Sequence, residues 1–450
     1  MAAAPTSTPA ARVRLLGPAL LLERAAWALE ALLARARVRE WLLVDDAAAP
    51  VDLELTLDAG QWQFTWDRVP DGATDPLAAT FWWLARVEEQ LAPPDAFDEH
   101  GRFRADHSAM VRSGDPLATP VDDLAMGLAK RLADHVAPRA AGEVAWRVVA
   151  THDIDLPWRW TRVGRRRALR SIREDLRRGR VGRALRTFGA LAAMPAWRLR
   201  GGDPWCNARR IHALEADEGA TSTSYLLAAT HVPEDGDAEL YVRGARYATD
   251  LAGLGPRELV GLHGSYTSSD VDGRLERERV AIEQRTAQPV VDHRFHYLRH
   301  RPVAAWPLLD GVGLRTDASL GFAEQPGFRA GTAHPYRAWD FAEGRPLDLV
   351  VIPLAVMDAS FDARYLGAGR RERARLVHEV VDRIRAAGGS ASLLVHNDRL
   401  CNAADDGWTT LYREVLRSVR GAGGQVGTAA AAAEAYLERV PAARRTRGAS

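Results

Sequence analysis

The chain has few cysteines, a single lysine and no long apolar run, and these shortages exclude whole classes of protein. Two cysteines in 450 residues cannot form a disulfide framework, so we expect free thiols at Cys206 and Cys401. No segment reaches the ~20 apolar residues that a membrane-spanning helix needs. The apolar run at residues 15–22 ends at Glu23 without a small-residue cleavage site, so no export signal is predicted and we expect a cytoplasmic protein.

The chain also lacks a large excess of charge of either sign. Lys plus Arg total 60 and Asp plus Glu total 59, which leaves +1 at pH 7. The chain as a whole therefore has no field that would favour nucleic acid as a partner. Almost all the positive charge is arginine, and the many Arg, Ala and Gly residues are typical of a GC-rich bacterial genome. The composition is that of a soluble globular protein, and it does not indicate an oligomeric state.

The length predicts roughly two or three domains. We divide the chain into a disordered tail at 1–11, an N-terminal α/β domain at 12–142, a second α/β domain at 147–440 and another disordered tail at 441–450. In the N-terminal domain, residues 51–57 alternate between apolar and polar, and the pattern resumes at 61–66 after a turn. This predicts a β-hairpin. Asp75-Pro76 then predicts the start of a helix over 77–91.

The second domain alternates apolar strand candidates with helical segments. The first candidate starts at Val148 and runs into the polar stretch 151–155. The others are 222–227, 259–263, 290–296, 349–354, 392–396 and 425–428. Alternating βα units predict a parallel sheet or barrel. Polar, reactive residues follow several of these strands, at the end where barrels carry their active sites.

An arginine-rich segment at 157–203 separates the first two strand candidates. Leu and Ala residues lie between its arginines, so the segment predicts basic amphipathic helices. Such helices are often only solvated faces whose side chains cover apolar neighbours. They also fit a peripheral contact with anionic lipid, or with a polyanionic glycan or carrier.

Three strand ends carry residues that can perform chemistry. In a strand, alternate side chains point the same way, so Asp153 and Asp155 are expected to face the inside of the barrel together. Two carboxylates so close repel unless a cation lies between them or one acts as a base. His263 and His396 each follow a strand candidate. Taken singly, such residues are often helix caps or packed histidines, but together they predict one catalytic site.

Residues 148–437 resemble the polysaccharide deacetylase family, also called the NodB-homology or carbohydrate esterase family 4 fold, which is a distorted (β/α)7 barrel. The resemblance implies Asp153 as catalytic base, Asp155 and His263 as metal ligands, and His396 as catalytic acid. It also implies a divalent metal, expected to be zinc.

The resemblance implies further residues around this centre. An arginine should orient the base, and Arg294 and Arg299 are both candidates. Arg329, on a later loop, is expected near the substrate, as are Tyr266, Arg299 and Asn397. The stretches 75–81, 88–89, 101–103, 313–321 and 357–360 are similar to a bacterial subfamily that carries an added N-terminal domain.

One position departs from the family pattern. The family has a second histidine four residues after the first, and here that position is Thr267. A catalytic zinc takes three protein ligands and a water, so the site is one ligand short. His296 is the expected replacement, with His152 and Asp292 as alternatives. A weakly held or absent metal is also open.

The predicted function is that of a metal-dependent hydrolase of a non-peptide C–N bond, expected to remove the acetyl group from an acetamido sugar in a glycan or glycan precursor. A cytoplasmic location favours a nucleotide-linked or lipid-linked precursor. Two alternatives remain. One is a metal-free hydrolase of a cyclic amide or imide, and the other is an inactive glycan-binding protein of polysaccharide biosynthesis.

Overall fold

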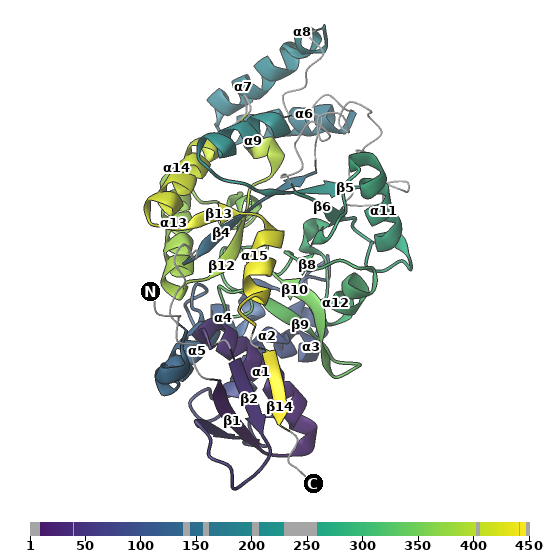
Figure 1. The fold of residues 1–450 in the computed structure, drawn as a ribbon. Coiled ribbons are helices and arrows are strands. Elements are labelled where there is room, and N and C mark those ends of the chain that lie inside the picture. The colour runs from purple at the N-terminus through teal and green to yellow at the C-terminus, as the bar shows by residue number, and fades with distance from the viewer. Residues whose placement is uncertain are drawn as a thin grey trace.

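The protein is mixed α/β and contains two sheets, as shown by a computed structural model (Figure 1). The structure describes residues 10–38, 40–137, 145–155, 162–199, 207–228, 259–401, 406–440 and 442–446. The smaller sheet lies at the end of the molecule that carries the N-terminal segments, and the larger, curled sheet occupies the centre.

The smaller sheet has the strand order β14-β2-β1-β3, and all of its pairings are parallel. Its strands are β1 (Ala11–Leu16), β2 (Glu40–Val44), β3 (Leu53–Thr56) and β14 (Ala442–Thr446). The prediction of a disordered tail at 441–450 is wrong for the residues of β14. That strand hydrogen-bonds to β2, so its backbone groups find partners that the sequence nearby does not reveal.

The predicted hairpin at 51–66 is also wrong. β3 pairs with β1, and residues 61–66 form no strand. Trp62 donates a hydrogen bond from Nε1 to Asp75 at 2.8 Å, and Phe64 stacks on Phe81 with ring centroids 5.9 Å apart. The alternating apolar residues are therefore used for packing against α2 (Pro76–Leu84), whose N-terminus Asp75 caps.

Further helices complete the N-terminal region. They are α1 (Ala19–Ala36), α3 (Val87–Leu91), α4 (Ala109–Arg112) and α5 (Pro120–Arg131), with short 3-10 helices at Pro94–Ala96, Ala105–His107 and Ala133–His135. The predicted helix at 77–91 is thus divided. Arg86, with φ of 57°, separates α2 from α3.

The larger sheet has the order β11-β12-β4-β5-β6-β7-β8-β10-β9, and β13 pairs with β4. Its strands are β4 (Arg147–Ile154), β5 (Thr223–Leu227), β6 (Leu259–Gly264), β7 (Asp292–Phe295), β8 (Thr316–Asp317), β9 (Tyr336–Asp340), β10 (Arg345–Val351), β11 (Leu354–Met357), β12 (Ser390–Leu394) and β13 (Gln425–Gly427). Every pairing is parallel except that of β9 with β10. The predicted strand candidates fall on strands of this sheet except 349–354, which is not one strand but the end of β10 and the start of β11. β8 and β9 were not predicted.

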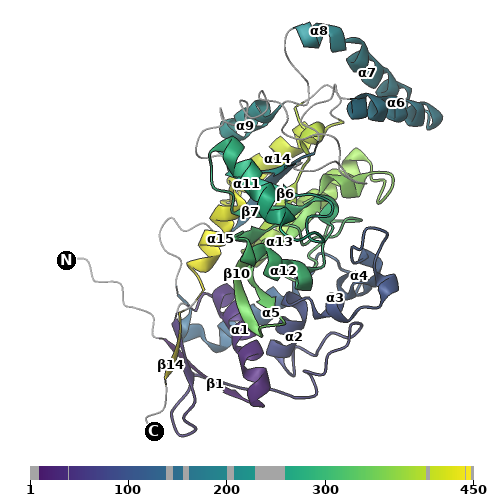
Figure 2. The same ribbon diagram turned by 90° about the vertical axis from the view of Figure 1, so that its right-hand side faces the viewer.

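Helices surround this sheet. They are α9 (Ala208–Asp217), α11 (Arg274–Thr286), α12 (Pro302–Gly311), α13 (Arg370–Ala387), α14 (Trp408–Gly421) and α15 (Ala429–Leu437). Three more, α6 (Arg162–Arg177), α7 (Val181–Ala192) and α8 (Met194–Leu199), lie between β4 and β5 in the chain. Figure 2 shows that these three stand out from the body of the molecule, at the end away from the smaller sheet.

One apolar core runs from the N-terminal region into the larger sheet. The Trp339 ring on β9 meets the rings of Trp27 and Phe81, with centroids 5.3 and 5.4 Å away. A buried ion pair crosses the same boundary, because Arg329 contacts Glu89 at 2.6 Å. The N-terminal region is therefore packed firmly against the β9–β10 side of the larger sheet.

The sequence also predicts the absence of membrane-spanning helices and the presence of free cysteines. Within the described residues, no helix is both long and apolar enough to cross a bilayer. Cys401 is a free thiol, as predicted, and Cys206 lies outside the described residues.

Candidate active site

The strand order brings the predicted polar residues to one edge of the larger sheet. Asp153 and Asp155 lie at the end of β4, His263 on β6, Arg294 on β7, and His396 just after β12. These strands are parallel and follow one another in the order β12-β4-β5-β6-β7, so their carboxyl ends meet. Four segments that are far apart in the sequence thereby contribute to one site.

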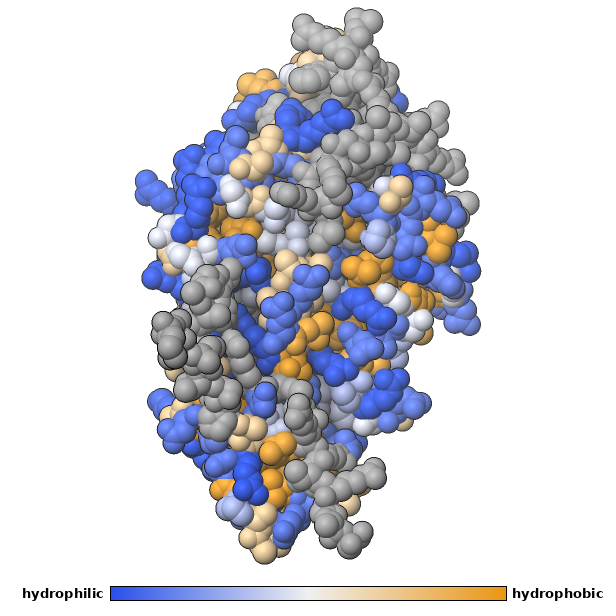
Figure 3. All heavy atoms as spheres, in the orientation of Figure 1, coloured by the Kyte–Doolittle hydropathy of each residue, from blue (hydrophilic) through white to orange (hydrophobic). Residues whose placement is uncertain are grey.

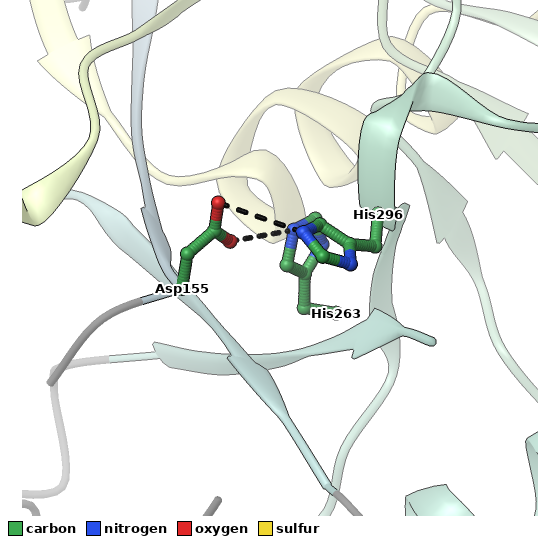
Figure 4. A group of neighbouring side chains, drawn as sticks. All are labelled: Asp155, His263 and His296. Carbon is green, nitrogen blue, oxygen red and sulfur yellow. Dashed lines mark ion pairs between the residues drawn. The ribbon is translucent and has the colours of Figure 1, made fainter. Parts of the chain in front are cut away.

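Asp155, His263 and His296 form a compact group of possible metal ligands (Figure 4). Oδ1 of Asp155 lies 3.2 Å from Nε2 of His263, and Oδ2 lies 3.6 Å from Nε2 of His296. The three ligand atoms are all within 4.8 Å of one another. Two histidines and a carboxylate are a common ligand set for zinc and other divalent metals.

The hydrogen bonds of these residues fit a cation. The Nδ1–H of His263 donates to the carbonyl oxygen of Arg294 at 2.9 Å, which leaves the lone pair of Nε2 facing Asp155. That Nε2 atom and Oδ1 of Asp155 are both buried and have no hydrogen-bond partner. Two buried acceptors 3.2 Å apart are unfavourable unless a cation or a proton lies between them.

Charge at the group favours the same conclusion. Burial opposes ionisation of Asp155, but His296, His263 and His396 around it hold its pKa well below the usual range. Asp155 is therefore an ionised carboxylate, as a metal ligand must be.

Of the three candidates for a third ligand, His296 is the one that lies beside Asp155 and His263. His152 donates from Nδ1 to the carbonyl of Val395 at 2.7 Å, bonds through Nε2 to Glu215 at 2.8 Å, and does not join the group. Asp292 is buried and accepts a hydrogen bond from Thr316 at 2.5 Å. Thr267, at the position of the family's second histidine, accepts a hydrogen bond from Arg274. The third member of the candidate group thus comes from the end of β7.

Arg294 holds Asp153 beside the candidate metal ligands. Its guanidinium donates to Oδ1 of Asp153 at 2.9 Å and lies over the ring of Tyr225, 4.6 Å from the centroid. It also donates to Thr151, Ser392 and the carbonyl of Ala318. The other Asp153 oxygen, Oδ2, lies 3.6 Å from Nε2 of His263. Arg294, of the two predicted candidates, is the arginine that orients Asp153.

His396 stands on the other side of Asp155 and is held by Asp358. Nδ1 of His396 lies 2.5 Å from Oδ1 of Asp358, and its backbone N–H donates to Oδ2 at 3.0 Å. Burial lowers the pKa of His396, but the charge and hydrogen bond of Asp358 outweigh this effect and raise it to about 10. The imidazole is therefore protonated at neutral pH. Its Nε2 atom lies 3.7 Å from Oδ2 of Asp155.

The sequence motifs include Asp358 only within the stretch 357–360 and predict no role for it. One signal was available: the buried carboxylate directly follows β11, at the same sheet edge as the other site residues. Arg399 assists it, with Nε 3.7 Å from Oδ2 of Asp358.

A cleft of about 250 Å³ opens over these residues. Besides the candidate metal ligands, Asp153 and His396, its lining includes Arg102, Arg364, Arg399, Tyr297 and Tyr365. Arg102 belongs to the N-terminal region. It pairs with Asp98 at 2.6 Å and donates to the carbonyl of Tyr297 and the hydroxyl of Tyr365. The N-terminal region therefore builds part of the cleft wall.

The four residues predicted to bind substrate do not line this cleft. Tyr266 bonds through its hydroxyl to His100 at 2.8 Å. Arg299 lies over the Tyr266 ring and pairs with Asp270 at 2.6 Å. Asn397 is buried, and its carbonyl accepts from the side chain of Asn207.

The placement of Arg329 near the substrate is wrong. Its guanidinium is buried and bonds to both carboxylate oxygens of Glu89, at 2.8 and 2.6 Å, and to the carbonyl of Gly321. The sequence around Arg329 does not indicate its partner, Glu89, because Glu89 lies in the N-terminal region. Arg329 joins the two parts of the chain.

Comparisons with known proteins add little to the geometry. No protein-family model matches the chain, and no curated protein matches it. A solved structure described as a "putative polysaccharide deacetylase from Mycobacterium smegmatis" is similar at 14% identity, over 70% of this chain and 98% of that one, with a TM-score of 0.41. A likeness this distant carries no argument about activity. The site itself is that of an α/β protein with a candidate divalent-metal centre.

Proposed function

We propose that this chain is a metal-dependent hydrolase that removes the acetyl group from an acetamido sugar of a glycan or glycan precursor, and that its larger sheet is a distorted (β/α)7 barrel of the NodB type. One observation carries the proposal. The candidate metal ligands lie between a carboxylate fixed by an arginine, Asp153 with Arg294, and a protonated histidine fixed by a carboxylate, His396 with Asp358.

These residues divide the acid and base work of amide hydrolysis between them. A bound divalent cation supplies Lewis acidity and makes a water molecule more acidic. Asp153 is placed to accept a proton from the attacking water, because Arg294 occupies its Oδ1 and leaves Oδ2 toward the residues that would hold the cation. His396 carries a proton that it can donate to the departing amine nitrogen. Asp358 keeps the imidazole in position and stabilises its charge.

The lining of the cleft is compatible with a sugar. The tyrosines Tyr297 and Tyr365 supply aromatic surface, and Arg102, Arg364 and Arg399 supply hydrogen-bond donors beside the catalytic group. The resemblance of the sequence motifs to the polysaccharide deacetylases supports an acetamido group as the bond to be cleaved.

The test is acetate release from a panel of N-acetylated sugars, oligosaccharides and nucleotide-linked sugars, with protein loaded with zinc, cobalt or manganese. We expect release with at least one substrate, and a fall of about 10²–10⁴-fold in kcat for Asp153→Asn and for His396→Gln. The exposed Asp382→Asn on α13 serves as control and should match the wild type.

Other outcomes would replace the proposal. Hydrolysis of a cyclic amide that survives exhaustive chelation would favour a metal-free hydrolase. Sugar binding without any acetate release from the metal-loaded protein would favour an inactive glycan-binding protein. Full activity in either site variant would contradict the roles given to Asp153 and His396.

A further inference from the structure

The helices α6 and α7 form an arginine-rich hairpin that stands out from the body of the protein (Figures 1 and 2). The two helices pack against each other and are joined by a turn with Gly179 at φ 69°. The hairpin follows Asp155 in the chain, so it leaves the larger sheet at the edge that carries the candidate active site. Its position alone does not show what it does.

In this hairpin, several large apolar side chains lie on the outside, where a folded protein usually has polar side chains. The residues buried in it are small or polar, namely Ala168, Asp175, Ala184 and Thr187. Five large apolar residues point outward and are 52–64% exposed, namely Leu169, Leu176, Val181, Leu185 and Phe188. Ile172 and Leu191 are partly buried. A helical hairpin that only needs to fold would bury such residues between its helices.

The exposed apolar residues are spaced so that each helix presents them on one side. Leu169 and Leu176 are seven residues apart on α6, which is two helical turns. On α7, Val181, Leu185 and Phe188 follow the i, i+4, i+7 pattern. Figure 3 shows hydrophobic surface over α7, at the outer edge of the molecule. Each helix thus has an apolar stripe that faces solvent.

The hairpin also concentrates positive charge. Residues 162–192 contain eleven arginines and two carboxylates, a net charge of +9 in a chain whose total is +1. Both carboxylates are already paired within the hairpin: Glu174 with Arg178 at 2.6 Å, and Asp175 with Arg180 at 2.9 Å. Most of the arginines are therefore available to an outside anion.

We propose that the α6–α7 hairpin docks on an anionic lipid bilayer. Its outward Leu and Phe side chains enter the boundary between headgroups and acyl chains, and its arginines bind lipid phosphates. A nucleic acid would satisfy the arginines but offers nothing to the apolar stripes. A second copy of the hairpin would cover the stripes but would set +9 against +9. A bilayer surface satisfies both features.

The direct test is co-sedimentation of the full chain with vesicles of phosphatidylcholine alone or mixed equally with phosphatidylglycerol. We expect the protein to sediment with the mixed vesicles and to remain in solution with phosphatidylcholine alone. Added salt should weaken the binding, because screening reduces the attraction between arginine and phosphate. Wild-type protein that stays in solution with the mixed vesicles would overturn the proposal.

The apolar stripe is tested by the double variant Leu185→Glu/Phe188→Glu. We expect its binding to the mixed vesicles to be weaker by at least about tenfold, since two apolar side chains no longer enter the bilayer. Leu20→Glu is the matched control, because Leu20 is exposed and lies outside the hairpin. All three positions are on the surface, and an unchanged Tm will show that the variants fold. Binding by the double variant equal to that of the wild type would overturn insertion.

The charge is tested by Arg170→Gln/Arg173→Gln/Arg177→Gln, which should lower binding to the level seen with phosphatidylcholine. The control Arg371→Gln/Arg375→Gln/Arg385→Gln removes three exposed arginines from α13 and should bind normally. Equal losses in both triple variants would mean a general charge effect and would overturn the assignment to the hairpin.

A dimer in solution that dissociates in Leu185→Glu/Phe188→Glu would identify a second copy as the partner. Vesicle binding needs no substrate, so these results do not depend on the proposed hydrolase activity.

Discussion

His396 and Asp358 lie 2.5 Å apart, Nδ1 to Oδ1, although 38 residues separate them in the chain. Asp358 is completely buried at the end of β11, and it also accepts the backbone N–H of His396. Burial raises its pKa and His396 lowers it, and the net result is a carboxylate with a pKa below the usual range. The pair therefore fixes both the orientation and the charge of the imidazole.

Replacing Asp358 should separate positioning from binding. We expect Asp358→Asn to lower kcat by about 10–100-fold with little change in KM, because the imidazolium loses the charge that stabilises it. Asp362→Asn is the control: it removes a neighbouring carboxylate that bonds to Arg399 and not to His396. Steady-state kinetics of acetate release measure both. An equal fall in kcat for the two variants would show that the effect is not specific to His396.

Metal binding should stabilise the folded protein through Asp155, His263 and His296. At a free metal concentration of 100 times Kd, the expected gain is about 2.7 kcal/mol, seen as a rise in Tm. His263→Ala should abolish the rise, while Thr267→Val should keep it, because the Thr267 hydroxyl accepts a hydrogen bond from Arg274. Plasma mass spectrometry of the same samples gives the bound metal. Metal retained at full stoichiometry in His263→Ala would contradict the ligand assignment.

Arg329→Ala should destabilise the fold without touching the catalytic residues. The change leaves Glu89 buried beside Arg86 as its remaining partner, and removal of one member of a buried pair typically costs about 3–5 kcal/mol. Urea unfolding measures the loss. Arg383→Ala breaks a pair with Asp115 that is about half exposed, so it should change stability by no more than about 1 kcal/mol. Similar losses in both variants would contradict the role of the Glu89–Arg329 pair.

Asp292→Asn should stabilise the protein at neutral pH. Burial raises the pKa of Asp292 from its usual value of 3.8 to about 6. Because the folded protein holds this proton more tightly than the unfolded chain, stability is greatest below pH 4 and declines as the pH rises to about 6. The Asn variant does not titrate, so its advantage should be small at pH 4 and about 3 kcal/mol at pH 7.5. Urea unfolding at the two pH values tests this, and a gain at pH 4 as large as that at pH 7.5 would contradict it.

The main elements of the larger sheet could be predicted from the sequence because its strands are buried apolar runs that end in polar residues. β8 has only two residues, and β9 reads Tyr-Arg-Ala-Trp-Asp, so neither gives such a signal. Residues 51–66 have the alternation of a hairpin, but the Trp62 side chain hydrogen-bonds to Asp75, at the start of α2, and not to a neighbouring strand. Alternation reports which side chains are buried and does not report what buries them.

The same limit applies to the site. Asp153, Asp155, His263 and His396 could be identified because strand ends collect at one edge of a parallel sheet. The role of Asp358 and the true place of Arg329 depend on partners 38 and 240 residues away in the chain. No local pattern contains that information.

The pairing of β2 with β14 has a consequence for how the protein is made. These neighbouring strands are separated by about 400 residues, and the whole larger sheet lies between them in the chain. On a ribosome, β1, β2 and β3 emerge early, yet the edge of β2 stays open until the larger sheet has been synthesised. An open parallel edge can pair with other chains, so a nascent protein of this fold is exposed to misassembly until its last strand arrives.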